Sequence, residues 1–253
     1  MEKTAVERVR SNGKIVGTMV RMVRNPSVAS IAKAAGLDFI MLDMEHGTYS
    51  LETVEDIAKV ARLCGVGIFA RVPSLDRAYV SRVMDAGVQG VMVPMISSAE
   101  EARKLVGWAR YEPIGNRGLS SNGGLTEYQG MGMDAPSFMA SQNLKTLTIA
   151  QIETKEAIDC IDEIAAVEGI DVLLIGPNDL SISLGLAGKA LDPVVQEAIG
   201  KVADSADRHN KIFSIHGSDA LLALWKDRMQ MVMTSIDCNV LTQGFSALAK
   251  KYK

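Results

Sequence analysis

Short apolar segments rich in Val, Ile, Leu and Met alternate along this chain with longer segments of helical period. Eight apolar segments occur, at 14–20, 39–44, 67–72, 90–96, 146–152, 171–176, 211–215 and 231–236. Between most of them, apolar residues recur every three or four positions opposite a polar face, as at 51–64, 75–87, 98–110 and 155–169. A strand followed by a helix, repeated in this way, predicts parallel βα units.

The apolar segments carry almost no polar alternation, which indicates strands buried on both faces. Eight βα units in about 250 residues match the size and repeat number of a (β/α)8 TIM barrel. We therefore expect one barrel domain over residues 1–253. An open doubly wound sheet is the alternative, but the connection after the first strand lacks the G-x-G-x-x-G pattern of a dinucleotide-binding fold.

Composition narrows the classes of function. Hydrophobic residues make up 47% of the 253 residues and charged residues 23%, enough for a substantial core. The net charge is -3 and no cluster of five or more Lys or Arg occurs, so we expect no nucleic acid partner. No apolar stretch is long enough for a membrane span, and the charged N-terminus is unlike a signal peptide.

The three cysteines point to a reducing compartment. Cys64, Cys160 and Cys238 are far apart, odd in number and set in apolar periodic segments, which favours reduced packing over disulfides or zinc. We therefore expect a cytoplasmic protein whose metal, if it binds one, is held by other ligands.

One connection interrupts the regular spacing. Residues 111–137 form a long, glycine-rich stretch, and loops of this length are usually functional or mobile. Its segment 120–124 lacks the ending of a phosphate-binding P-loop, so we interpret it as a flexible lid. In a barrel, the carboxyl ends of the strands and the loops after them form the active face, so candidate residues are sought there.

The ends of the second and third strands carry charged residues. Asp43, Glu45 and His46 follow the second strand, and a histidine beside a carboxylate suits a general base. Arg71 ends the third strand, where it must face a carboxylate or an anionic ligand and can stabilise a developing oxyanion. The alternatives are that the acidic residues cap the next helix and that Arg71 pairs with Asp43 or Glu45.

The fifth and sixth strands end in further polar residues. Gln151 and Glu153 lie two positions apart and so share one side of a strand, and Asp179 follows a glycine in the segment 176–181. Two carboxylates on adjacent strands can supply hard oxygen ligands to Mg2+ or Mn2+. The alternative, nearly as good from spacing alone, is that Asp179 caps a helix while Glu153 pairs with Arg71 or Lys155.

Other chemistry receives less support from the residues. A Schiff-base aldolase needs a lysine inside the barrel, and only Lys155 comes near a strand end. His216, in a turn after the seventh strand, is expected to make local hydrogen bonds, and His209 to be solvated. The numerous methionines are expected to fill gaps in the core.

Taken together, the strand ends resemble a known family. The motifs LDMEHG, ARVP, GVMVPMI, YEPIGNRG, QIET and GPNDLS occur in this order and spacing, and they resemble the HpcH/HpaI aldolases. The resemblance runs from about residue 13 to residue 190. It implies a class II, metal-dependent aldolase that cleaves a 4-hydroxy-2-oxo acid to pyruvate and an aldehyde.

The resemblance also implies roles for individual residues. Glu153 and Asp179 would bind the metal ion, Mg2+ or Mn2+. His46 and Asp43 would be the acid/base pair, and Arg71 would contact the keto oxygen of the substrate.

The expected substrate pocket and assembly follow from the same resemblance. Gln151 would line the pyruvate pocket, and the backbone of Gly176, Pro177 and Asn178 would hold the carboxylate of the 2-oxo acid. A homo-oligomer is implied, a hexamer or trimer of dimers, with the C-terminal helix exchanged between neighbours. The alternatives are a related lyase acting on acyl-CoA, an enolate-forming decarboxylase and a noncatalytic 2-oxo acid binding protein.

Overall fold

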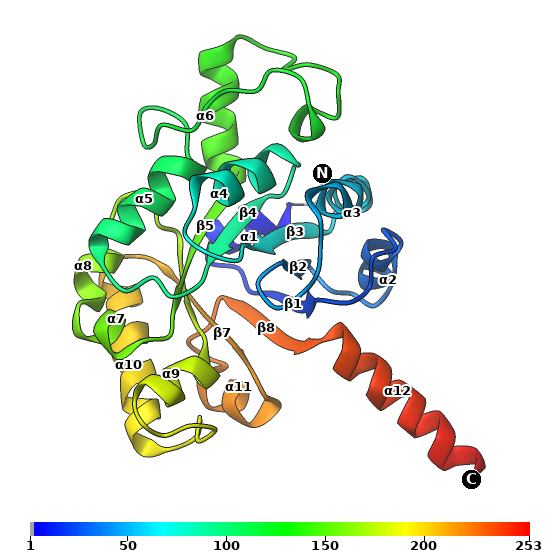
Figure 1. Cartoon of the computed structure of the whole chain (residues 1–253), viewed down its shortest axis with the longest axis vertical. Helices are drawn as coiled ribbons and strands as arrows, with labels where there is room; N and C mark the ends of the chain where they lie inside the picture. Colours follow the sequence, from blue (N-terminus) through cyan, green and yellow to red (C-terminus); the bar gives the residue numbers. More distant parts are fainter. Residues whose placement is uncertain (1–2) are drawn as a thin grey trace.

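Eight parallel strands close into a barrel in this computed structural model, which describes residues 3–253 (Figure 1). Each strand pairs with the next in sequence, and the last pairs with the first. The strands are β1 (Ile15–Val20), β2 (Phe39–Asp43), β3 (Gly67–Arg71), β4 (Gly90–Val93), β5 (Leu147–Ile152), β6 (Val172–Ile175), β7 (Ile212–Gly217) and β8 (Met231–Ile236). The predicted (β/α)8 barrel is confirmed, and each strand overlaps one of the eight apolar segments.

Helices surround the barrel and cover its outer face (Figure 1). They are α1 (Ala5–Arg10), α2 (Val28–Ala34), α3 (Leu51–Cys64), α4 (Arg77–Asp85), α5 (Ala99–Ala109), the short 3-10 turn η1 (Gly124–Thr126), α6 (Ala135–Lys145), α7 (Lys155–Asp159), α8 (Ile161–Ala165), α9 (Pro177–Ser183), α10 (Pro193–Arg208), α11 (Asp219–Trp225) and α12 (Asp237–Tyr252). The helical segment expected at 155–169 is split into α7 and α8 at Cys160, whose backbone leaves the helical region with a φ of -122° and a ψ of 28°. Within residues 3–253, no helix has the length and apolarity needed to cross a membrane.

Local sequence signals explain where several helices begin and end. The side-chain oxygens of Ser50, Asp76 and Ser98 accept backbone N–H groups at the starts of α3, α4 and α5. Gly65 ends α3 with a φ of 70°, a left-handed conformation that glycine adopts without steric cost. These caps leave the barrel-facing sides of the helices free for apolar packing.

The interior of the barrel is filled by side chains from alternate strand positions, in addition to the separate apolar layer between strands and helices. Five of the fourteen methionines fill this interior, as expected: Met19, Met41, Met92, Met231 and Met233. The expectation does not hold for Met22, Met95 and Met133, which are exposed. Residues of α1 close the N-terminal end of the barrel over this cluster. Gly17 makes room for Phe39, because a Cβ at Gly17 would lie only 2.5 Å from the ring of Phe39. The interior is therefore packed, and polar chemistry is confined to its carboxyl end.

The last helix leaves the body of the protein. In Figure 1, α12 (red) extends from the end of β8 away from the barrel, and among its residues only Asp237 is buried. Large apolar side chains along it are exposed to solvent: Val240, Leu241, Phe245, Leu248 and Tyr252. Among residues 3–253, no apolar surface covers these side chains.

Candidate active site

A cavity of about 740 Å3 opens at the carboxyl ends of the strands. Its lining includes charged and polar side chains from strands that are far apart in sequence: Arg21, His46, Arg71, Gln151, Asp179 and His216. Most of these follow the inward-facing positions of their strands, so the closed barrel brings them to one place. The cavity lies at the carboxyl ends of the strands, where the sequence predicted the active face.

Asp43 forms the buried centre of a charged cluster. Its two oxygens accept hydrogen bonds from the Nε and Nη2 atoms of Arg71 at 2.9 and 2.8 Å, because β2 and β3 place the two residues in register. The Nε of Arg21 donates to the same carboxylate at 2.8 Å. Burial opposes the charge, but the bonds and charge of Arg71, with that of Arg21, outweigh it and lower the pKa of Asp43 from 3.8 to about 2. Asp43 is therefore an anion throughout the physiological pH range.

Glu45 links this cluster to the exposed histidine. Its Oε2 lies 2.8 Å from Nη1 of Arg71 and 3.8 Å from Nε2 of His46, and burial raises the pKa of Glu45. The side chain of His46 is 54% exposed and opens to the cavity. Asp43, expected as the partner of His46, meets only its backbone N–H, at 3.3 Å. The carboxylate beside the imidazole is therefore Glu45.

Among the acids of the site, Glu153 has the pKa that is shifted furthest from its ordinary value. Its side chain lies just past β5 and is 2% exposed, and its Oε1 accepts the backbone N–H of Met95 at 2.9 Å. Burial, together with the nearby charges of Asp179 and Glu45, raises the pKa of Glu153 to about 7 despite that hydrogen bond. A divalent cation would relieve both causes of the shift, since it replaces lost hydration and offsets the neighbouring negative charges.

Glycine at position 176 makes this arrangement possible. A Cβ at Gly176 would lie 2.0 Å from Oε2 of Glu153 and 2.7 Å from Nε2 of Gln151. Gln151 donates to the same Oε2, and its own Oε1 has no hydrogen-bond partner among residues 3–253. Asp179, exposed in the first turn of α9, faces the same cavity.

The carboxylates fit a hard divalent cation. Three acids interact electrostatically here, Glu45, Glu153 and Asp179. No cluster of three or more potential ligands within residues 3–253 is already arranged around a metal position. The protein ligands of a divalent cation here would therefore be the two carboxylates Glu153 and Asp179. Water and substrate would occupy the other positions, which is the kind of coordination that Mg2+ prefers.

Comparison with known proteins assigns the chain to a family. The model of the HpcH/HpaI aldolase/citrate lyase family matches residues 20–233. The chain belongs to this family. Relatives include 4-hydroxy-4-methyl-2-oxoglutarate aldolase tasA of Hapsidospora irregularis, 31% identical over 92% of this chain and 89% of that protein. Another is 4-hydroxy-2-oxovalerate aldolase of Novosphingobium aromaticivorans, 38% identical over 70% of this chain and 68% of that protein.

Solved structures agree with this assignment. The crystal structure of an HpcH/HpaI aldolase from Desulfitobacterium hafniense superposes with a TM-score of 0.93 at 32% identity, covering 99% of this chain and 96% of the other. The family predicted from the motifs is confirmed, and so is the assignment of the chain as an enzyme of the aldolase and lyase class.

Arg21 and His216 also line the cavity of this HpcH/HpaI protein, although neither was predicted to be a site residue. Arg21 follows β1 and lines the cavity. It lies two positions after the inward-facing Met19, so its place just beyond a strand end could have indicated it in the sequence. His216 was expected to bond locally, and its Nε2 does lie 3.1 Å from the carbonyl oxygen of Ser235, but the ring also lines the cavity. Burial lowers the pKa of His216, so its ring is neutral at pH 7.

The long loop does not behave as the expected lid in this chain. None of residues 111–137 lines the cavity. The loop is instead held against α3 on the outside of the barrel, where Arg62 donates to the carbonyl of Gly124 at 3.1 Å and pairs with Glu127 at 3.0 Å. The loop therefore does not cover the cavity of its own chain, where a lid was expected.

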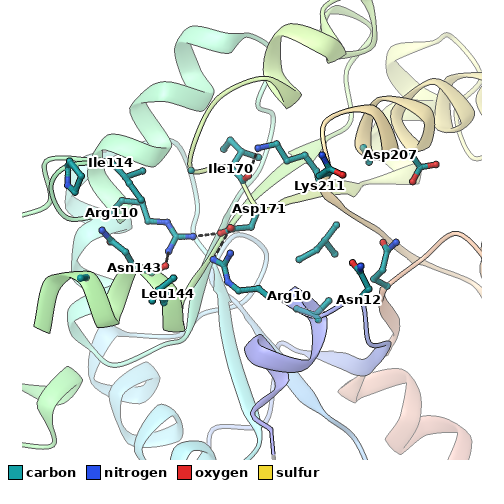
Figure 2. A pocket seen from close by; sticks show the side chains of 18 residues that line it. Arg10, Asn12, Arg110, Ile114, Asn143, Leu144, Ile170, Asp171, Asp207 and Lys211 are labelled. Carbon is teal, nitrogen blue, oxygen red and sulfur yellow. Dashed lines mark hydrogen bonds and ion pairs between the residues drawn. The ribbon is translucent and has the colours of Figure 1, made fainter. Parts of the chain in front are cut away.

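A second cavity, of about 700 Å3, lies at the N-terminal ends of β6 and β7 (Figure 2). Arg10 and Arg110 converge there on Asp171, and Lys211 donates to two backbone carbonyl groups. Its arginines and its lysine therefore already have partners within the chain. At this end of a barrel such a cluster serves stability rather than catalysis.

Proposed function

We propose that this chain is a divalent-metal-dependent class II aldolase that cleaves a 4-hydroxy-2-oxo acid to pyruvate and an aldehyde. The observation that carries the proposal is one cavity lined by Asp179, Arg71 and His46. The carboxylate of Glu153 lies directly behind this lining, against Gln151 and Gly176. The relatives named above act, by their names, on 4-hydroxy-2-oxo acids.

The metal ion would be held by Glu153 and Asp179, whose hard carboxylate oxygens favour Mg2+ or Mn2+. When bound, such a cation would supply Lewis-acid polarisation of the keto group and stabilise the enolate of pyruvate. The raised pKa of Glu153 supports this assignment, because a buried acid crowded by other carboxylates is a favourable place for a cation.

Backbone and amide groups would orient the 2-oxo acid. Gly176 donates its N–H to Ile152, and Pro177 has none, so the unused amides nearest the cavity are those of Asn178 and Asp179. No side chain caps this turn, which leaves these donors for the substrate carboxylate. Gln151, with an unused amide oxygen, would complete the pyruvate pocket.

His46 would be the general acid/base. Its exposed imidazole can take the proton from the C4 hydroxyl, and Oε2 of Glu45 lies 3.8 Å from its Nε2. Arg71 would stabilise the oxyanion that forms on bond cleavage. Asp43 keeps a low pKa and both arginines as partners, so within the acid/base pair its role would be to hold Arg71 rather than to exchange protons.

Pyruvate release tests the proposal. The purified protein, supplied with 4-hydroxy-2-oxo acids of different tails, should form pyruvate and aldehyde in equal amounts. A chelator should abolish the activity and Mg2+ or Mn2+ should restore it. Full activity in chelator would refute the metal requirement. Release of CO2 in place of aldehyde would indicate a decarboxylase, cleavage of an acyl-CoA alone a thioester lyase, and pyruvate binding without any turnover a binding protein.

The exposed helix supports an oligomer. We propose that α12 packs on a neighbouring copy of this chain, which would cover Phe245 and Leu248, now 67% and 58% exposed. Replacing both by glutamate should shift the mass measured by light scattering to a smaller species, while the control Lys250→Glu on the same helix should not. An unchanged mass in the double variant would contradict the packing of α12 on a neighbouring copy.

We also propose the cytoplasm as the site of this activity. Cys64, Cys160 and Cys238 are all free thiols, which suits a reducing compartment.

A further inference from the structure

Arg21 is held in place by two buried carboxylates from different strands. Asp237, at the end of β8, accepts the backbone N–H groups of Arg21, Met22 and Val23 at 3.1, 2.9 and 2.8 Å. Asp43, at the end of β2, accepts from the Nε of the Arg21 side chain at 2.8 Å. Both the backbone and the guanidinium of this residue are therefore fixed before any ligand arrives.

Packing restricts the side chain further. A Cβ at Gly47 would lie 3.2 Å from Cγ of Arg21 and 3.0 Å from its carbonyl oxygen, so the backbone after β2 presses closely on the arginine stem. A cation whose rotamer is already set loses little conformational entropy when it binds an anion.

The outer edge of Arg21 is unused. Its only hydrogen bond from the side chain goes from Nε to Asp43, and neither Nη atom has a hydrogen-bond partner in the described part of the chain. Arg71 differs, because its Nε, Nη1 and Nη2 all meet carboxylates of Asp43 or Glu45. Within the described residues, both Nη groups of Arg21 are therefore free for a ligand, whereas each nitrogen of Arg71 already meets a carboxylate.

The position of Arg21 separates it from the metal ligands. In the closed order of strands, β1 lies four strands from β5, so Arg21 faces the acid Glu153 across the barrel mouth. Arg71, on β3, lies midway between them. A substrate whose 2-oxo acid end lies at β5 and β6 and whose keto oxygen reaches Arg71 would extend its remaining carbons toward β1, β7 and β8. The cavity lining continues in that direction, through His216 and Ser235.

We propose that Arg21 is a specificity-determining residue that binds a carboxylate on the half of the substrate released as the aldehyde. The preferred substrates are then dicarboxylic, and the aldehyde product carries a negative charge. This inference rests on the proposed function for its assignment of the two ends of the substrate. Arg21 would bind this carboxylate through charge-assisted hydrogen bonds from its planar, pre-oriented guanidinium.

Two pairs of probes of equal carbon number test the role of Arg21. For turnover, 4-hydroxy-2-oxoglutarate and 4-hydroxy-2-oxopentanoate differ only in the terminal carboxylate. For binding without turnover, 2-oxoglutarate and 2-oxopentanoate differ in the same way and can be titrated calorimetrically with Mg2+ present. The quantity compared is the preference for the dicarboxylate, as a ratio of kcat/KM or of Kd values.

In Arg21→Gln we expect this preference to fall about 10- to 100-fold, the range for hydrogen bonds to a charged group at about 1.4 kcal/mol per factor of ten. Arg21→Lys should recover part of it, because the charge remains. The control Arg24→Gln removes an arginine that bonds the Thr48 hydroxyl outside the cavity, and it should leave the preference unchanged.

A merely structural role for Arg21 gives a different result. If Arg21 only supported Asp43, Arg21→Gln would weaken both members of each pair by the same factor, and an unchanged preference overturns the inference. A wild-type preference in binding without pyruvate formation from any substrate would refute the aldolase function while leaving the anion subsite intact. Equal binding of both 2-oxo acids by the wild type would overturn the subsite itself.

Discussion

The buried acid at position 153 leads to a prediction in which stability and activity change in opposite directions. Glu153 is 2% exposed, and burial with the charges of Asp179 and Glu45 raises its pKa from 4.5 to about 7. The folded, metal-free protein therefore binds a proton at this site that the unfolded chain has released above pH 4.5. Stability from this group is complete below pH 4.5 and declines as the pH rises toward 7.

The magnitude follows from the shift. A difference from 4.5 to about 7 corresponds to about 3 kcal/mol at about 1.4 kcal/mol for each pKa unit. Glu153→Gln removes the charge at nearly constant volume. The new amide can still accept the N–H of Met95, and Gln151 can turn its unpaired Oε1 toward the new NH2 group. In chelator at pH 8, the variant should be up to about 3 kcal/mol more stable than the wild type.

Urea denaturation in chelator at pH 5, 6.5 and 8 measures this difference. The advantage of Glu153→Gln should grow with pH, and the same variant should lose its metal-dependent pyruvate formation. Glu156→Gln, an exposed position on α7, is the matched control and should change stability by less than about 0.5 kcal/mol at every pH. A variant less stable than the wild type at pH 8, or a difference independent of pH, would refute the reasoning.

Two further predictions concern the residues around this acid. Asp43→Asn leaves the buried Arg71 without its main partner and should cost about 3 to 5 kcal/mol in urea denaturation at pH 7; a loss under about 1 kcal/mol would contradict the ion pair. In the wild type, stability from Asp43 is complete above pH 3.8 and should be lost as the pH falls toward 2, measured by acid titration of circular dichroism. Gly176→Ala places a methyl group 2.0 Å from Glu153 and should weaken Mg2+ binding about 10- to 100-fold by calorimetry, and unchanged affinity would argue against Glu153 as a ligand.

The sequence alone predicted the barrel and much of the candidate site. A strand buried on both faces must be apolar at nearly every position, so the apolar segments marked all eight strands. Because strand ends converge in a barrel, Asp43, Arg71, Gln151 and Glu153 could be assigned to one end of it from their places in the sequence. Arg71 and Gln151 line the cavity there, and Asp43 and Glu153 are bonded to them. These inferences depend on burial and periodicity, which are local properties of the chain.

Pairing between strands was decided only by the tertiary structure. Asp43 was expected beside its near neighbour His46, but the strand turns it into the barrel, where the register brings it against Arg71 and Arg21. Such contacts join residues far apart in the chain, and no local pattern specifies which carboxylate an arginine will meet. For the same reason the sequence did not indicate the free edge of Arg21.

The placement of the segments outside the barrel was also a tertiary outcome. The sequence of residues 111–137 predicted a lid, yet contacts from Arg62 hold this loop against α3, outside the cavity of its own chain. The apolar positions of α12 are visible in the sequence, but the direction in which β8 ends carries them away from the barrel. Hydrophobic period predicts that a face will be buried, whereas the partner that buries it depends on the geometry of the whole fold.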